Sequence, residues 1–179
     1  MDLSFKLSDN SKKLENFDKD TNATFADVGS FSDIGSYEME CKDAKLSCPS
    51  KLFLKDLLGL TGCEISLNKM TAGSKAPFAH KHKENEELWI VLKGTGSIGV
   101  DGKEYPVKEG SFLKIAPAGV RTISATTDLE FLCIQTKAGS LTESTLTDAE
   151  INAKHESKFL SDEEYEILIN FYNEYKSEN

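Results

Sequence analysis

From Cys63 onward, apolar and polar residues alternate over short segments that are separated by turn residues. The segments are four to eight residues long and rich in β-branched and aromatic residues, which is typical of strands. They read CEISLNKM, ELWIVLKG, SIGV, KEYPV, SFLKIA, RTISA and LEFLCIQ. Turn signals such as Asp101-Gly102 and Pro117 with Gly119 lie between them. The pattern predicts an antiparallel sandwich or small barrel.

The pattern becomes helical after Ser140. Ser161 and Glu164 form a capping box, as Thr147 and Glu150 do more weakly. Spacings of three and four predict one apolar face made of Tyr165, Leu168, Ile169, Tyr172 and Tyr175. Ile167 and Phe171 widen this face. This helix has to bury that face, either against its own barrel or against another subunit.

The chain before Cys63 carries weaker signals. Residues 1–25 are polar with isolated leucine and phenylalanine, which leaves open a flexible arm or a segment that packs over the barrel or over a neighbouring subunit. SYEME predicts a short strand, and KLFLKDLLG predicts a short helical turn that ends at Gly59. The expected organisation is a polar, partly flexible arm over residues 1–35, a barrel over 36–140 and an acidic helical extension over 141–179.

Length and charge narrow the class of protein. A chain of 179 residues is long enough for one well-cored domain with extensions. Its net charge is −9, with ten acidic residues and three lysines from Glu143 onward, and this argues against a nucleic-acid partner. No signal peptide or bilayer-spanning run is visible, so we expect a cytoplasmic protein without a membrane partner, whose four cysteines stay reduced.

Candidate chemistry gathers between Gly73 and Gly94, in GSKAPFAHKHKENEELWIVLKG. In a strand, His80 and His82 would share one face, and Glu87 at the start of the next strand could reach the same point. Two imidazole nitrogens and one carboxylate oxygen suit a divalent transition metal such as Fe, Mn, Zn, Ni or Co, with positions left open for water or substrate.

These residues resemble the first motif of the cupin superfamily, in which a glycine, a His-x-His pair, a glutamate and a second glycine follow at similar spacing. The second motif matches at Gly110, Pro117 and Gly119, but its histidine position falls on Thr122. The resemblance covers about residues 63–137 and implies an all-β core that forms a double-stranded β-helix (cupin) barrel of antiparallel strands, with a pocket between two sheets. Many such proteins form dimers, so a homodimer is expected.

The resemblance implies a metal held by His80, His82 and Glu87, with the family's fourth ligand replaced by the Thr122 hydroxyl, a poor ligand for such ions. His155 is not expected to reach the site. Two alternatives stay open: a three-ligand metal site, or a metal-free pocket in which the histidines act as hydrogen-bonding or acid–base groups.

Strand alternation adds candidates for the pocket wall. Trp89 shares the face of Glu87, as pocket wall or as a core tryptophan. Thr122 and Ser124 share a face, and Arg121, the only arginine of the chain, should point the other way unless the turn after Gly119 alters the alternation. An arginine beside the pocket could bind a carboxylate or phosphate, although a surface ion pair is the alternative. Weaker candidates for the rim and wall are Phe78 and Gln135.

Two functions are therefore predicted. One is a metal-dependent oxygenase, isomerase or lyase that acts on a small anionic or hydroxylated molecule. The other is a non-catalytic cupin that binds or senses a small ligand and has lost its metal, because a fold alone does not decide between them.

Overall fold

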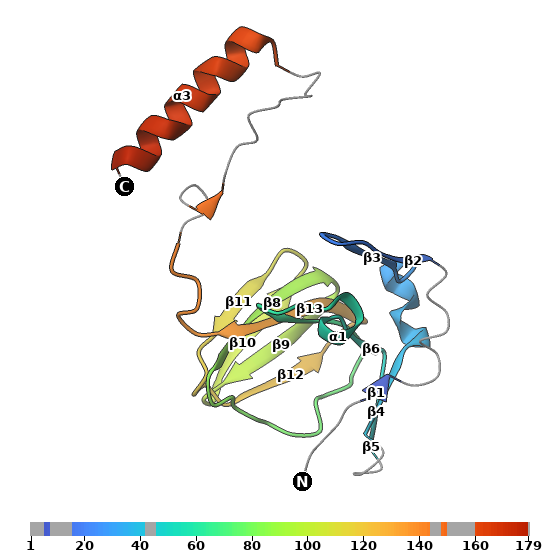
Figure 1. Ribbon diagram of the computed structural model, residues 1–179. Helices are drawn as coiled ribbons and strands as arrows, with labels where there is room; N and C mark the ends of the chain where they lie inside the picture. The colour runs from blue at the N-terminus through green and yellow to red at the C-terminus, as the bar shows by residue number, and fades with distance from the viewer. Residues whose placement is uncertain (1–5, 8–15, 42–45, 144–147, 150–159, 179) are drawn as a thin grey trace. The chain divides into compact units, whose positions relative to one another are not determined.

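The structure, a computed structural model, describes residues 6–7, 16–41, 46–143, 148–149 and 160–178. The chain divides into two units, Met1–Ala138 and Gly139–Asn179. All strands of the described residues belong to the first unit, and helix α3 (Asp162–Glu178) belongs to the second (Figure 1). The predicted all-β core with a helical C-terminal extension is confirmed. The boundaries predicted at residues 35 and 140 stay predictions.

The larger sheet of the first unit has five antiparallel strands in the order β11-β8-β13-β7-β6. Their bounds are β6 (Lys51–Phe53), β7 (Glu64–Met70), β8 (Asn85–Lys93), β11 (Phe112–Ile115) and β13 (Leu129–Lys137). Strand β6 corrects the prediction of a helical turn over KLFLKDLLG, because only α1 (Lys55–Leu58) is helical there. The alternation of buried Leu52 with two half-buried neighbours is that of a strand.

The smaller sheet has three antiparallel strands in the order β10-β9-β12. Their bounds are β9 (Thr95–Val100), β10 (Lys103–Lys108) and β12 (Arg121–Ala125). Asp101 and Gly102 connect β9 to β10 with φ values of 50° and 83°, the two positive angles of a type I′ hairpin turn. The hairpin predicted from this dipeptide is thus present, and it sets the register between the two strands.

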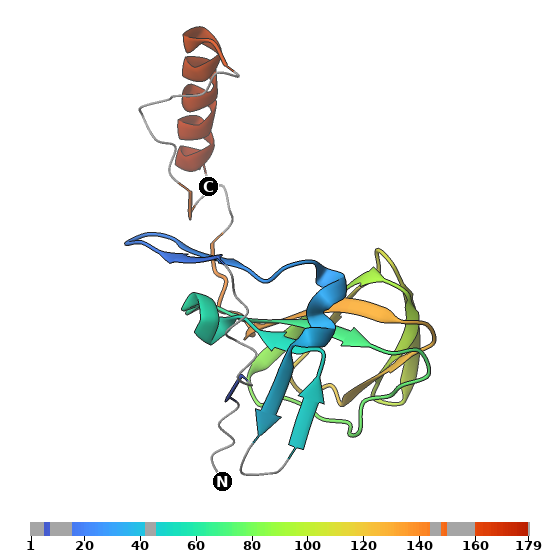
Figure 2. The same cartoon turned by 90° about the vertical axis from the view of Figure 1, so that its right-hand side faces the viewer.

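An apolar core fills the space between these two sheets, which face each other in Figure 1 and Figure 2. The indole of Trp89 stacks on Phe131 with ring centroids 5.4 Å apart. The buried members are Trp89, Val91, Ile98, Val107, Ile115, Ile123, Ala125, Leu129, Phe131 and Cys133. Because these residues come from strands of both sheets, the core holds the barrel closed.

The connection from β7 to β8, residues 71–84, runs along the free edge of β12. Isolated bridges pair Lys75 with Ser124 and His80 with Arg121. The backbones of His80 and Arg121 exchange two hydrogen bonds, of 3.1 and 2.8 Å, and the His82 N–H donates to the Pro117 carbonyl at 3.0 Å. The histidines therefore lie beside the start of β12, although neither belongs to a named strand.

A second apolar cluster covers the outer face of the larger sheet. Ile34, Tyr37, Leu52 and Leu67 are its buried members, and Ile34 belongs to the 3-10 helix η2 (Phe31–Ser36). Two small sheets complete the described N-terminal part, with the strands β1 (Lys6–Leu7), β4 (Glu38–Cys41) and β5 (Leu46–Pro49) in one and β2 (Asn16–Lys19) and β3 (Thr24–Asp27) in the other.

Helix α3 begins with the predicted capping box. The Ser161 N–H donates to the Glu164 carboxylate at 2.8 Å, and the Glu164 N–H donates to the Ser161 hydroxyl at 3.2 Å. Thr147 and Glu150 lie outside the described residues.

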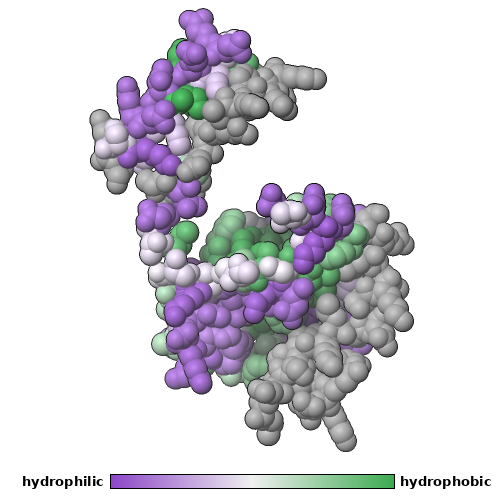
Figure 3. Space-filling view, viewed as in Figure 1, coloured by the Kyte–Doolittle hydropathy of each residue, from purple (hydrophilic) through white to green (hydrophobic). Residues whose placement is uncertain are grey.

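Only part of the predicted apolar stripe of α3 is buried. Tyr172 is buried and donates a hydrogen bond to the Ala149 carbonyl, whereas Leu168 is 43% exposed. Ile167 and Phe171 are also exposed, and the described surface of α3 is mainly hydrophilic (Figure 3). Among the described residues, no helix is both long and apolar enough to cross a bilayer.

Candidate metal centre

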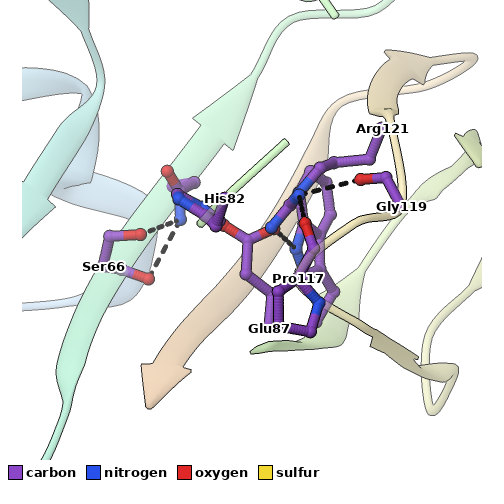
Figure 4. A network of polar contacts seen from close by, with 8 residues as sticks. Ser66, His82, Glu87, Pro117, Gly119 and Arg121 are labelled. Atoms are coloured by element: carbon purple, nitrogen blue, oxygen red, sulfur yellow. Dashed lines mark hydrogen bonds and ion pairs between the residues drawn. The ribbon is translucent and has the colours of Figure 1, made fainter. Parts of the chain in front are cut away.

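Glu87 is the centre of the polar cluster inside the barrel. It lies near the start of β8, its side chain is 2% exposed, and both carboxylate oxygens are occupied (Figure 4). Oε1 lies 2.8 Å from Nε2 of His82, and Oε2 accepts hydrogen bonds from Trp89 Nε1 at 2.9 Å and Arg121 Nε at 2.7 Å. Burial alone would raise the pKa of Glu87, but hydrogen bonds from Arg121, Trp89 and His82 hold it below its ordinary value. The group is therefore an ionised, rigidly held carboxylate.

Arg121 is fully buried and points into this cluster (Figure 4). Its Nη1 donates to the Gly119 carbonyl at 2.8 Å, and the Pro117 carbonyl lies 3.4 Å away. Its Nη2 is buried and has no hydrogen-bond partner among the described residues. An arginine remains charged at every physiological pH, so a permanent cation lies directly beside Glu87.

The facing of β12 is the reverse of the one predicted. Arg121, Ile123 and Ala125 are buried, whereas Thr122 and Ser124 are half-buried on the opposite face of the strand. The physical reason is the register of β12 with β9, which sets Ile123 opposite the core residue Ile98 and so turns Thr122 away from the carboxylate. Thr122 and Ser124 therefore do not belong to this cluster, and the guanidinium lies on the face where a fourth ligand was expected.

His80 and His82 meet Glu87 from the connecting segment. Their rings are in edge-to-face contact, with centroids 5.3 Å apart, and the three residues offer ligand atoms within 4.8 Å of one another. Nδ1 of His80 is buried without a partner among the described residues. Burial is the main cause that lowers the pKa of His80. The charge of Glu87 raises this pKa, and the charge of Arg121 lowers it further. His80 is therefore neutral at pH 7 and able to bind a cation.

These residues fit one divalent ion. In a tetrahedral site with ligand distances of about 2.1 Å, donor atoms lie about 3.4 Å apart. The widest pair of this group, at up to 4.8 Å, therefore has to close by up to about 1.4 Å, which side-chain rotation can supply. His80 makes no side-chain hydrogen bond through Nδ1 to any described residue. Trp89 and Arg121 donate to Oε2 of Glu87, and such bonds orient a metal-binding carboxylate and leave its other oxygen for the ion. The chain thus contains a His-His-Glu group that could hold a metal ion.

The other predicted wall residues lie at different distances from this group. Trp89 is a core tryptophan, one of its two predicted roles, and its N–H donates to Glu87, while its role as a pocket wall stays a prediction. Gln135 pairs with Glu87 across β13 and β8 and shares its face. Phe78 is 60% exposed, and its ring centroid lies 5.7 Å from that of His80.

The sequence interpretation missed several residues of the inner face. Cross-strand pairs of the larger sheet put Lys51, Ser66, Asn68 and Cys133 on the same side as Glu87. Lys51 was missed because β6 was predicted to be helical, although alternation about Leu52 was the available signal. Burial raises the pKa of the Cys133 thiol to about 12, and the charge of Glu87 adds to this effect. Cys63 and Cys133 are free cysteines, while the side chains of Cys41 and Cys48 lie outside what the structure describes.

Comparisons with known proteins agree with this architecture. The family described as Cupin domain matches residues 67–135. A cupin protein from Bacteroides fragilis is 45% identical over 57% of this chain and 88% of its own, with a TM-score of 0.55. A predicted oxalate decarboxylase from Thermotoga maritima is 31% identical, over 41% of this chain and 64% of its own, with a TM-score of 0.39.

An RmlC-like cupin protein from Desulfovibrio desulfuricans is 27% identical over 42% of this chain and 72% of its own, with a TM-score of 0.40. Among curated proteins, no sequence is significantly similar to this chain.

Proposed function

This chain belongs to the cupin superfamily, and from that premise we propose that it binds one divalent transition metal ion and, beside it, a small anionic or hydroxylated molecule. The ligands of the ion would be His80, His82 and Glu87. Two nitrogens and one oxygen with open positions suit Zn, Fe, Mn, Ni or Co.

The observation that carries the proposal is the convergence of three donor side chains within 4.8 Å of one another. They come from the 71–84 connection and from β8, and their approach depends on the backbone bridge between His80 and Arg121. A surface cluster of acidic groups would not have this form, because Glu87 is buried and its outer oxygen is held by two donors. Such outer bonds orient a ligand and raise metal affinity.

The metal and the side chains around it would have separate roles in the reaction. When bound, the metal supplies a Lewis acid or an oxygen-activating centre, which suits an oxygenase, isomerase or lyase. Arg121 would orient an acidic group of the substrate through Nη2, which has no acceptor among the described residues. Trp89 provides a rigid apolar wall and keeps the Glu87 carboxylate in one orientation.

One observation favours a second candidate, a cupin that binds a small ligand without metal or catalysis. The Arg121 guanidinium pairs with Glu87 at 2.7 Å, and its charge opposes that of any divalent ion at the same carboxylate. In that protein the two imidazoles would be hydrogen-bonding groups for the ligand.

Metal analysis of protein purified without chelator or nickel resin tests the first proposal. We expect close to one equivalent of a transition metal, and calorimetric titration of the stripped protein should restore it. Glu87→Gln should abolish uptake, because it removes the only charged ligand. Its matched control is Glu86→Gln, since Glu86 faces the other way and forms an exposed ion pair with Lys114 at 3.0 Å.

Less than about a tenth of an equivalent, with no binding of added Zn, Fe, Mn, Ni or Co, would contradict the metal proposal and leave the metal-free candidate. A loss of metal in Glu86→Gln equal to that in Glu87→Gln would show that the effect is not local to the site.

We also propose a homodimeric protein of the cytoplasm without a nucleic-acid or membrane partner. The support is the acidic charge of −9 and the frequency of dimers in this superfamily. Light scattering coupled to size exclusion would give twice the chain mass of 19.8 kDa.

A further inference from the structure

Lys51 brings a second cation to the inner face of the barrel. It pairs with Asn68 in the register of β6 and β7, and Asn68 contacts the Phe131 carbonyl on the next strand. Leu52, its neighbour, packs on the opposite face in the second apolar cluster. Lys51 therefore projects to the side of the sheet that carries Glu87 and Cys133.

The environment of Lys51 leaves its charge unneutralised among the described residues. Its Nζ lies 4.9 Å from the ring centroid of Phe53, and no carboxylate of the described part of the chain pairs with it. Phe53 lies in the cross-strand row that continues through Ser66 and Cys133 to Trp89, so the ammonium leans over the row that leads to the site. Glu64, on the same face, directs its carboxylate to the exposed N–H of Lys55 at 3.0 Å.

Arg121 supplies the unsatisfied donor that points to a ligand. Its side chain is fully buried, Nε is bonded to Glu87 and Nη1 to Gly119, and Nη2 has no acceptor among the residues that the structure describes. A buried guanidinium N–H without an acceptor is costly, so an oxygen atom is the group that this position requires. Because Arg121 is already neutralised by Glu87, the charge of Lys51 is the one that calls for a negative ligand.

We propose that Lys51 and Arg121 form a subsite for a small organic anion, with the oxygen of a carboxylate or phosphate group accepting from Nη2 of Arg121 and the charge of Lys51 neutralising it. The anion lies beside His80, whose Nδ1 also has no partner in the described part of the chain. This inference rests on the proposed function in that it names the ligand class of the same site. It adds Lys51, which comes from a strand outside the matched residues 67–135.

The single tryptophan of the chain gives a direct readout. Its Nε1–H donates to the same Glu87 oxygen that Arg121 contacts, so anion binding at Arg121 should shift the indole N–H resonance and the fluorescence. Full-length, metal-stripped protein is titrated with malonate, with inorganic phosphate and with neutral malonamide. We expect saturable shifts with at least one anion and none with malonamide, and the stronger anion identifies a carboxylate or a phosphate group.

Lys51→Gln should weaken binding of that anion by about tenfold or more, because a charged partner is lost. Lys51→Arg should restore binding, and the matched control Lys55→Gln, at an exposed lysine of α1, should leave it unchanged. If Lys51→Gln does not fold, Lys51→Arg still has to bind the anion and its affinity still has to fall with salt.

Equal affinity for malonamide, unchanged anion affinity in folded Lys51→Gln, or absence of any saturable shift would overturn the inference. The same stripped protein is titrated separately with metal, so the two proposals fail independently. Metal binding without an anion effect contradicts the subsite alone, and anion binding without metal uptake contradicts the metal proposal alone.

Discussion

Replacing Arg121 by histidine should convert the three-ligand group into a four-ligand site. Arg121 lies on the inner face of β12, beside Glu87, where the second motif of the family was expected to supply its histidine. Arg121→His removes a fixed positive charge and offers a neutral nitrogen donor from the same backbone position. We expect metal affinity to rise.

The size of the effect follows from the geometry of Glu87. Nε of Arg121 lies 2.7 Å from Oε2, so an ion about 2.1 Å from Oε1 would be roughly 5 Å from the guanidinium. A dication and a monocation at about 5 Å repel by roughly 7 kcal/mol at an effective dielectric constant of about 20. Screening and the turning of the new imidazole toward the ion reduce this gain. A tightening of at least about a hundredfold, about 2.7 kcal/mol, should remain.

The substitution has an opposing cost in the metal-free protein. Loss of one partner from a buried ion pair destabilises a fold by about 3–5 kcal/mol. The stripped Arg121→His protein should therefore unfold at lower denaturant than the unmodified protein, and added metal should recover most of the difference. Isothermal titration with a competing chelator measures the affinity, and urea unfolding with and without metal measures the recovery.

Thr122→His is the matched control, because Thr122 lies on the other face of β12. Its metal affinity should stay near that of the unmodified protein. If folded Arg121→His binds metal no more tightly than the unmodified protein, the electrostatic reasoning is wrong. If Thr122→His tightens binding equally, the observed facing of β12 is contradicted.

Three further predictions concern single residues. Gly94→Ala should lower the free energy of unfolding, measured in urea, by about 2 kcal/mol or more. The reason is that φ at Gly94 is +86° and that a Cβ would lie 1.9 Å from a backbone carbonyl oxygen. Gly102→Ala is the control and should lower it clearly less, because the space around its Cβ is open. Trp89→Phe should weaken metal binding in calorimetry by about ten- to a hundredfold, because it removes an N–H that orients Glu87, and an unchanged affinity would show that this bond is dispensable. Iodoacetamide at pH 8 should label Cys133 only after unfolding, since its pKa of about 12 leaves almost no thiolate, and rapid labelling of the native protein, read by peptide mass, would contradict its burial.

Local patterns in the sequence were sufficient for the barrel strands. β-branched residues between turn dipeptides predicted β7 to β13, and Asp101-Gly102 identified the hairpin whose positive φ values the structure contains. These features depend on neighbours in the chain, so they can be read without knowledge of the fold. The donors His80, His82 and Glu87 were found in the same way, because motif spacing is local.

Two features could not be read locally. The facing of β12 is set by its pairing with β9, in which Ile123 lies opposite Ile98, 25 positions earlier in the chain, and alternation from the preceding turn gave the opposite result. Lys51 lies on the inner face because β6 pairs with β7, whereas the local sequence KLFLKDLLG predicted a helical turn.

The sequence by itself determined the all-β core, its turns and the three donor residues. Only the tertiary structure decided that the remaining position beside Glu87 is occupied by the Arg121 guanidinium and not by the Thr122 hydroxyl. The physical reason is that side chains alternate along a strand, so a shift of one residue reverses every facing, and the pairing that fixes the register comes from a distant segment.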